Sequence, residues 1–156
     1  MLEKIIHTKI TDAPAEHEND HAGYEYYKRA LVPLGLAEQC VVAAYEIPPG
    51  KAAYPYHYHT QKEESFFILR GKGLLKTPAG DKTVEAGDFL FFPANETGAH
   101  KLTNTSETEM LVYIDFDTRN KIDAAVYPDS GKIGVWGGGI DQVFRTAQQV
   151  DYYDGE

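Results

Sequence analysis

Short apolar runs, separated by turn-forming residues, fill the chain between residues 39 and 116. The runs are rich in Val, Ile, Phe and Tyr, and the segments PPG, RGKG, PAGD and EAGD interrupt them. Such runs between such turns are typical of β-strands in an antiparallel sandwich or barrel. The predicted strands are QCVVAAYEI (39–47), ESFFILR (64–70), KGLLKT (72–77), DKTVEA (81–86), DFLFFP (88–93), AHKLTN (99–104) and TEMLVYIDF (108–116).

Two of these runs are apolar on both faces. In ESFFILR, Phe66 and Ile68 point to one side while Phe67 and Leu69 point to the other, and DFLFF behaves likewise. A sheet with one solvated face alternates apolar and polar residues, so something should cover the outer face. An N-terminal segment or a second subunit could do so, and we expect a homodimer around a two-fold axis.

The flanks of the strand-rich region carry weaker patterns. We expect one domain, in which residues 1–38 form an N-terminal arm and strands that pack on the barrel, 39–116 the core, and 117–156 a C-terminal extension. Residues 12–22 are polar and predict a loop. Helical signal is confined to short segments near the C-terminus, DAAVY (123–127) and QVFRTAQQV (142–150), and the second is equally compatible with a strand followed by a tail. The predicted fold class is therefore all-β, an antiparallel sandwich or jelly-roll barrel with only short helices.

Charge and composition exclude several partners. The formal net charge is -9 and no block of Lys or Arg occurs, which argues against nucleic acid as a partner. No apolar stretch reaches secretory or membrane-spanning length, so we expect a cytoplasmic protein without a membrane partner. The single cysteine, Cys40, lies in an apolar run and allows neither an intrachain disulfide nor a thiolate cluster.

The segment from residue 50 to 71, GKAAYPYHYHTQKEESFFILRG, carries the first chemical signal. His57 and His59 are two residues apart in an extended run, which places both imidazoles on one face. The chain then turns through TQKE and returns at Glu64. Two imidazoles and a carboxylate suit a first-row divalent ion. The alternative is a solvated hairpin tip, since six histidines make a chance His-x-His plausible.

A second segment, GDFLFFPANETGAHKLTN (87–104), follows about one hairpin later and supplies His100 from a separate strand. Three imidazoles and one carboxylate leave one or two positions open on an octahedral ion. Open positions are typical of metals that bind a ligand or take part in catalysis.

The two segments together resemble the paired motifs of the cupin superfamily, in particular small single-domain bacterial cupins with a double-stranded β-helix. The matching positions are Gly50, His57, His59, Glu64, Gly71, Gly87, Pro93, Gly98, His100 and Asn104. The spacing to Gly71 favours Glu64 over its neighbour Glu63 as the ligand. Two departures from the motif spacing occur, one extra residue after Gly50 and about two after Pro93. Both fall in turns, where a change in length has a small effect on the free energy of folding.

The resemblance implies one divalent ion, zinc, iron, manganese, nickel or copper, held by His57, His59, Glu64 and His100. The side chains that share a face with these ligands, or that project from the facing strand, are expected to line a small-molecule pocket. They are Phe66, Ile68, Leu102, Asn104, Met110 and Val112. An ordinary β core is the alternative for each of them.

Several other residues near the ligands have weaker claims to a role in the site. Tyr54, Tyr56 and Tyr58 alternate with the histidines along the extended run. Their side chains should therefore point to the opposite face, and we expect them outside the barrel. Lys62 is expected on a solvated hairpin tip. Glu63 is a possible hydrogen-bond acceptor that orients a histidine ligand.

Three functions are compatible with this site. The first is a binding or sensing cupin whose metal holds a small oxygen-rich ligand without turnover. The second is a metal-dependent enzyme, a dioxygenase or an isomerase. The third, a metal-independent sugar-nucleotide epimerase, needs a free histidine base, whereas the histidines here are committed to metal. No general base outside the ligand set is identifiable, so the sequence does not decide whether the protein is an enzyme.

Overall fold

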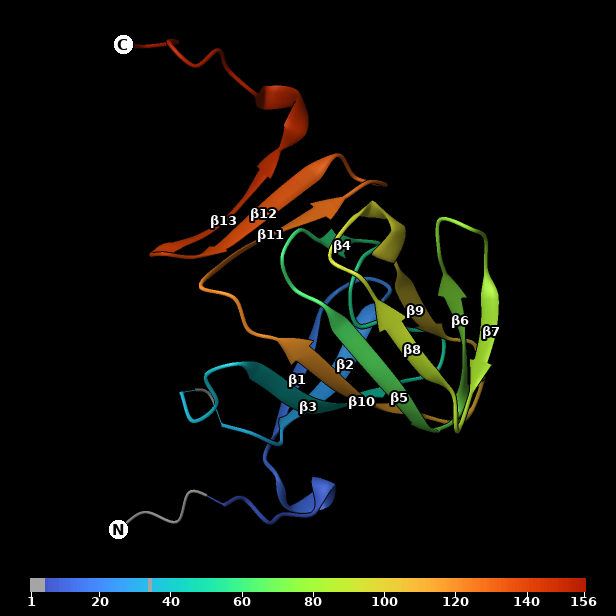
Figure 1. The fold of residues 1–156 in the computed structure, drawn as a ribbon. Helices are drawn as coiled ribbons and strands as arrows, with labels where there is room; N and C mark the ends of the chain where they lie inside the picture. Colours follow the sequence, from blue (N-terminus) through green and yellow to red (C-terminus); the bar gives the residue numbers. More distant parts are fainter. Residues whose placement is uncertain (1–4, 34) are drawn as a thin grey trace.

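The computed structural model describes residues 5–33 and 35–156 and consists almost entirely of β-strands and their connections (Figure 1). Helical segments among these residues are 3-10 turns, Ile10–Asp12, Glu96–Gly98 and Thr146–Gln148. The all-β antiparallel fold class expected from the sequence is thus confirmed. No helix in the described part of the chain is long and apolar enough to cross a membrane, and the cytoplasmic location stays a prediction.

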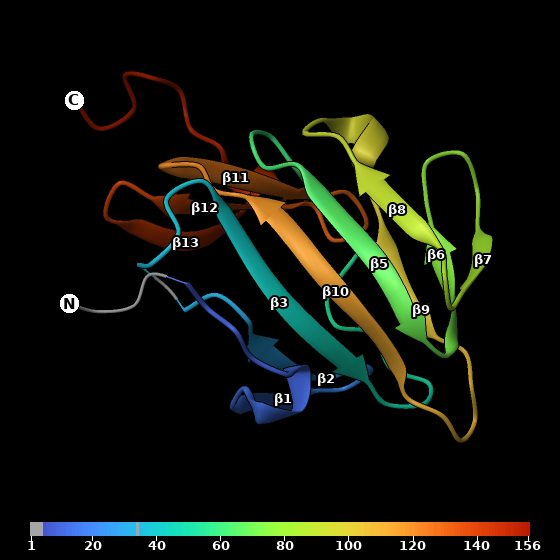
Figure 2. The same ribbon diagram turned by 60° about the horizontal axis from the view of Figure 1, so that its bottom comes forward.

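Three antiparallel sheets make up the fold (Figures 1 and 2). The largest has six strands in the order β1 (Ala15–His21), β2 (Tyr24–Ala30), β3 (Cys40–Ile47), β10 (Leu111–Thr118), β5 (Glu64–Arg70) and β8 (Phe89–Phe92). A sheet of β7 (Lys82–Glu85), β6 (Lys72–Lys76) and β9 (Lys101–Asn104) lies across from it. The third sheet, at one end of the barrel, has the order β13 (Ile140–Arg145), β12 (Lys132–Gly137), β11 (Ile122–Tyr127) and β4 (Tyr58–His59).

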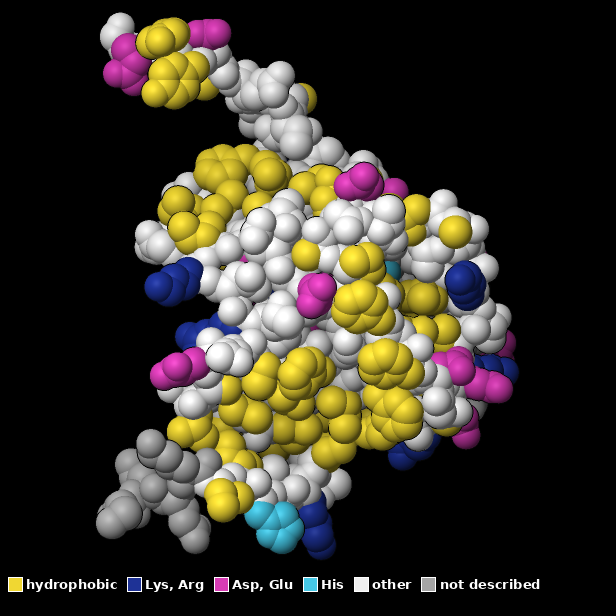
Figure 3. Space-filling model, viewed as in Figure 1, with side chains coloured by type: hydrophobic (Ala, Val, Ile, Leu, Met, Phe, Trp, Pro, Cys, Tyr) yellow, Lys and Arg dark blue, Asp and Glu magenta, His cyan; other side chains and the backbone are white. Residues whose placement is uncertain are grey.

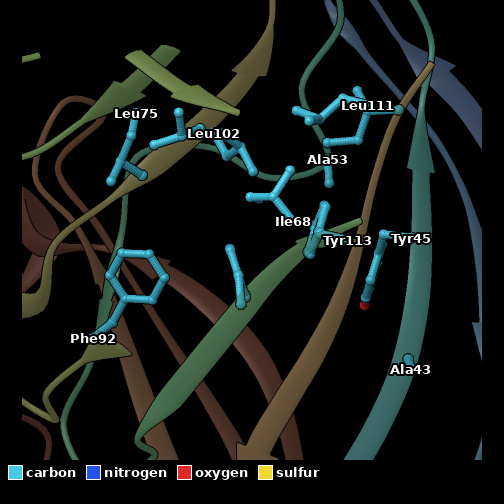
Figure 4. Packing of buried hydrophobic residues seen from close by; sticks show 12 residues of the cluster. Ala43, Tyr45, Ala53, Ile68, Leu75, Phe92, Leu102, Leu111 and Tyr113 are labelled. Atoms are coloured by element: carbon cyan, nitrogen blue, oxygen red, sulfur yellow. The ribbon is translucent and has the colours of Figure 1, made fainter. Parts of the chain in front are cut away.

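The hydrophobic core fills the space between the first two sheets. Figure 4 shows Leu75 and Leu102 of the smaller sheet on one side of the cluster and Tyr113 and Tyr45 of the larger sheet on the other. Tyr45 and Tyr113 stack with ring centroids 5.2 Å apart, and aromatic pairs of this kind add about 0.5–1.5 kcal/mol beyond burial. Leu111 and Tyr113 are almost fully buried, as expected for alternate residues that face inward from one strand.

Sequence patterns failed at both ends of the chain. The polar segment 12–22 was expected as a loop, but residues 15–21 form β1, which pairs with β2 and stacks His17 on Tyr27 at 4.1 Å. Segment 123–127, which has helical signal, lies in β11 instead, and segment 142–150 takes its alternative form, the end of strand β13 followed by the 3-10 turn Thr146–Gln148 and a tail. In each case pairing with a neighbouring strand decides the structure, and local propensity does not reveal that neighbour. The division into 1–38, 39–116 and 117–156 within one domain stays a prediction.

The outward face of the six-stranded sheet carries a continuous apolar surface (Figure 3). Its members are between 38% and 65% exposed: Phe67 and Leu69 on β5, Phe89 and Phe91 on β8, and Phe116 on β10. We call these five residues the outer apolar face. The N-terminal strands β1 and β2 do not cover it, because they extend the same sheet beyond β3.

Gly71 lies between β5 and β6 in the left-handed region, with a φ of 82°. A Cβ atom there would lie 2.6 Å from the carbonyl oxygen of Met110. We expect Gly71→Ala to lower the free energy of unfolding by about 2–5 kcal/mol, because left-handed backbone costs about 1–2 kcal/mol and overpacking about 1–3 kcal/mol. Gly80 (φ 106°) has open space around its Cα, so Gly80→Ala should lose only the backbone part. Equal losses in urea unfolding would contradict the close approach at Gly71.

Candidate metal centre

His57, His59 and Glu64 converge at one end of the barrel. Their ligand atoms all lie within 4.8 Å of one another. Nε2 of His59 lies 3.4 Å from Oε1 of Glu64, and Nε2 of His57 lies 4.0 Å from Oε2. His59 ends β4 and Glu64 begins β5, so the hairpin expected from TQKE does bring the carboxylate back to the imidazoles.

His100 approaches the same carboxylate from just before β9. Its backbone and that of His57 exchange two hydrogen bonds, of 2.9 and 3.1 Å. Nε2 of His100 lies 3.5 Å from Oε2 of Glu64. The imidazole stacks on the ring of Phe92 with centroids 3.6 Å apart, so the apolar core supports this side chain directly.

The Nδ1 atom of each histidine faces a hydrogen-bond acceptor. His57 and His100 use the backbone carbonyls of Pro55, at 2.8 Å, and Gly98, at 2.9 Å. His59 uses the carboxylate of Asp123. An acceptor at Nδ1 holds the ring proton there, which leaves Nε2 with a free lone pair. In His57 and His100 the Nε2 atom therefore presents a lone pair near Glu64, whereas Nε2 of His59 carries a proton that it shares with Glu64 and becomes a metal ligand once that proton is released.

The electrostatics of the cluster favour a cation. Burial lowers the pKa of His100 to about 4 and also lowers that of His57, so both rings are neutral near pH 7. Burial opposes ionisation of Glu64, but the hydrogen bond from His59 and the nearby histidine charges lower its pKa to about 2. Although burial disfavours a charged His59, its hydrogen bonds with Asp123 and Glu64 raise its pKa to about 9. The carboxylates thus draw positive charge into the site.

Asp123, on β11, orients His59 and was missed by the sequence analysis. Its Oδ1 accepts hydrogen bonds from the backbone amides of Gln61, at 3.0 Å, and Lys62, at 3.4 Å, while Oδ2 faces His59. The sequence suggested Glu63 for this role, but Glu63 is exposed. No local pattern could point to Asp123, because it lies 64 residues from His59 and reaches it only through the β11–β4 pairing.

We expect Asp123→Asn to weaken metal binding by about 10- to 100-fold, the range found when a partner of a metal ligand is removed. With Oδ1 still bound to two backbone amides, the new Nδ2 would face Nδ1 of His59, and two N–H donors cannot bond. His59 would then move its proton to Nε2, the ligating atom. Competition with a chromogenic chelator for Zn²⁺ or Mn²⁺ measures the change.

Asp129→Asn is the control for this substitution, since Asp129 pairs with Lys76 at 2.7 Å on the surface and does not contact the cluster. If both variants bound metal as tightly as the unaltered protein, Asp123 would have no orienting role.

A cavity of about 450 Å³ borders the cluster. Its walls combine carboxylates, cations and aromatic rings. The side chains that line it are Lys28, Val41, Tyr45, Tyr54, His57, His59, Lys62, Glu64, Asp115, Asp117, Thr118, Arg119, Asn120, Asp123, Tyr127 and Trp136, together with Gly137. The wall therefore combines aromatic surface with charged groups that the apolar pocket expected from the sequence does not include.

The six side chains proposed from sequence as a pocket lining lie elsewhere in the barrel. Phe66 and Leu102 border a separate void of about 10 Å³, and Ile68 is buried in the core. The side-chain amide of Asn104 donates to the carbonyls of Ile47 and Glu109. Met110 precedes β10, and Val112 alternates with the inward-facing Leu111 and Tyr113.

Two residues expected outside the site line this cavity. Tyr54 contacts His57 edge-on at 6.3 Å, and its hydroxyl lies 3.0 Å from that of Tyr45. The parity argument failed because residues 53–56 do not form a strand. Lys62 was expected on a solvated tip, but its Nζ lies 3.3 Å from Oδ2 of Asp117.

Comparison with known proteins identifies relatives. Residues 43–116 match the family model described as a cupin domain. The crystal structure of a protein described as a putative sugar phosphate isomerase, from Acidithiobacillus ferrooxidans, has 28% sequence identity and a TM-score of 0.81, with 91% of each chain covered. A sugar phosphate isomerase from Silicibacter pomeroyi has a TM-score of 0.80 over 94% of this chain and 96% of that one. Its 18% identity shows a shared fold alone.

A curated protein from Aquifex aeolicus, described as uncharacterised, is 36% identical over 58 residues. The match covers 37% of this chain and 46% of the relative, so it spans less than half of that protein.

Proposed function

Because the chain is a member of the cupin superfamily, we propose that it is a metal-dependent isomerase of a small phosphorylated sugar. The observation that carries this proposal is the set of three Nδ1-anchored imidazoles that point their Nε2 atoms toward Glu64 on the wall of a polar cavity. The 28% identity to a protein described as a putative sugar phosphate isomerase, over 91% of both chains, supports the choice of reaction.

His57, His59, Glu64 and His100 are proposed to hold one divalent ion. Imidazole nitrogens and a carboxylate suit zinc, iron, manganese, nickel or copper, and the three Nε2 atoms turned toward Glu64 provide those nitrogens once His59 releases its Nε2 proton. When bound, such an ion supplies Lewis-acid polarisation of a sugar oxygen. Asp123 and the two backbone carbonyls hold the ligand rings in the orientation that this requires.

The cavity is also suited to a phosphate group and to several hydroxyls. Lys28 and Arg119 both line it, and cationic side chains bind phosphate through charge-assisted hydrogen bonds. The guanidinium of Arg119 is held in place by the carbonyl of Ala37 at 2.6 Å. A ligand with a negatively charged end and a hydroxyl-rich body would therefore find partners on several sides.

The residues that line the cavity fit an isomerase better than a dioxygenase that acts on an apolar substrate. Conversion of an aldose to a ketose moves hydrogen from C2 to C1 and from O2 to O1, so it consumes no oxidant. Carboxylates and cations around the cavity suit the hydroxyls and the phosphate of a sugar phosphate, whereas a catechol carries no phosphate for Lys28 and Arg119 to bind.

We expect the metal-loaded protein to interconvert aldose and ketose phosphates. Incubation of D-ribose 5-phosphate or D-fructose 6-phosphate in D₂O, followed by NMR, would detect the isomer and deuterium at the carbon that exchanges its proton. The chelator-treated protein is the control. Tight binding without conversion would favour a binding or sensing protein, and oxygen uptake with a 1,2-diketone or a catechol would favour a dioxygenase.

We also propose that the protein is a homodimer that buries the outer apolar face. Four half-exposed phenylalanines leave roughly 400 Å² of apolar area on this face, taking about 200 Å² for each ring. A stable interface buries about 800 Å² per partner with an apolar share of about 65% at its core. The outer apolar face therefore supplies most of the apolar area that one side of such a dimer needs.

A further inference from the structure

Two carboxylates of β10 face the cavity beside the metal cluster. Asp115 and Asp117 lie on the inward face of the strand with Tyr113 and are 7% and 6% exposed. In the antiparallel register Asp117 lies directly opposite Glu64, and Asp115 lies opposite Phe66, one pleat further from the cluster. Both line the cavity. They therefore extend a polar wall from the metal ligands toward the core.

One oxygen of each carboxylate has no partner outside this pair of carboxyl groups. Oδ2 of Asp117 accepts a hydrogen bond from Nζ of Lys62 at 3.3 Å. Oδ1 of Asp117 and Oδ1 of Asp115 are buried, and no other residue among 5–33 and 35–156 donates a hydrogen bond to them. A buried polar atom without a donor is unfavourable, because it has lost its hydrogen bonds to water. Two such atoms on one cavity wall indicate groups that a bound molecule satisfies.

The surroundings make this pair suited to hydroxyl groups. Burial and the neighbouring charge of Asp117 raise the pKa of Asp115 well above its usual range, which favours an O–H donor beside carboxylate acceptors. A sugar hydroxyl both donates and accepts hydrogen bonds, so it can pair with either form. The ammonium of Lys62 fixes the Asp117 carboxylate in place.

We propose that Asp115 and Asp117 each bind a hydroxyl group of the ligand and thereby select hydroxyl-rich molecules, an inference that rests on the proposed function. The carboxyl groups of Asp115 and Asp117 lie within hydrogen-bond reach of each other, so together they offer a donor and acceptors to neighbouring hydroxyls of a sugar chain. Asp117, opposite Glu64, contacts the part of the sugar nearer the metal ligands. Asp115 contacts a part further inside the barrel.

Binding of two probes tests this inference by calorimetry on the metal-loaded protein. D-Fructose 6-phosphate carries several hydroxyls, whereas phosphoglycolate carries a carboxylate and a phosphate but no hydroxyl. We expect Asp115→Ala and Asp117→Asn to weaken binding of the sugar phosphate at least 10-fold and to change phosphoglycolate binding less than 3-fold. Asp115→Asn, which keeps the shape of the side chain, covers the case in which the alanine variant folds poorly.

Glu46→Gln is the matched control, because Glu46 is a half-buried carboxylate that pairs with Arg29 outside the cavity. It should bind both probes as the unaltered protein does. Equal losses for both probes, or no loss for either, would overturn the role of Asp115 and Asp117 while the proposed function stood. If the unaltered protein bound phosphoglycolate but neither fructose 6-phosphate nor ribose 5-phosphate, the proposed function itself would fail.

Discussion

His59→Ala is expected to reduce the metal content to less than a tenth of that of the unaltered protein. Apparent binding free energies of about 10–16 kcal/mol for four-ligand zinc sites correspond to roughly 3 kcal/mol per ligand, or more than 100-fold in affinity. The substitution also removes the partner of Asp123, so a carboxylate that now orients a ligand would lose that role. Elemental analysis after metal loading and gel filtration measures the change.

The fold should survive the loss of His59. The side chain lies at the end of the two-residue strand β4 and is absent from the apolar cluster that holds the two larger faces together. His17→Ala is a matched control, since His17 is a histidine of β1 that stacks on Tyr27 outside the cluster. A β-type circular dichroism spectrum with unchanged metal content in His59→Ala would falsify the metal site.

The fold of the central region and the convergence of His57, His59 and Glu64 were predictable because local patterns encode them. Strands such as ESFFILR and TEMLVYIDF have the apolar, aromatic and β-branched composition that is typical of paired strands, and glycine-containing turns separate the strands. His57, His59 and Glu64 come from a single hairpin, so their convergence follows from a short turn between two extended segments. His100 needed a second motif, because only strand pairing brings it to His57.

The remainder of the site was not predictable, for a physical reason. Asp123 reaches His59 through the packing of the C-terminal sheet on β4, a long-range contact that no local spacing reveals. Asp115 and Asp117 lie on the same alternating face as Tyr113, but this parity becomes meaningful only once β10 is known to face the cavity. Tyr54 was placed on the wrong side for a similar reason: the backbone at residues 53–56 is irregular, so the side chains there do not alternate between two faces as they would in a strand.

Phe89→Glu is expected to convert a dimer into a monomer. Phe89 is 65% exposed at the edge strand β8, the most exposed phenylalanine of the outer apolar face. Losing burial of about 130 Å² at 25 cal/mol per Å² costs about 3 kcal/mol in each copy. An isologous interface contains the substitution twice, so the dissociation constant should rise at least about 10³-fold. Light scattering at micromolar concentration would report twice the mass of one chain before the substitution and one chain after it.

The control variant Ile140→Glu distinguishes a specific interface from non-specific association of exposed apolar side chains. Ile140, on β13, is 44% exposed but belongs to the C-terminal sheet, so Ile140→Glu should leave the mass doubled. The N-terminal strands lie in the plane of the six-stranded sheet and leave its outer face free, so a second copy is the partner that the self-complementary apolar surface favours. A single-chain mass for the unaltered protein at micromolar concentration would refute the dimer. Loss of the dimer in Ile140→Glu but not in Phe89→Glu would place the contact outside the outer apolar face.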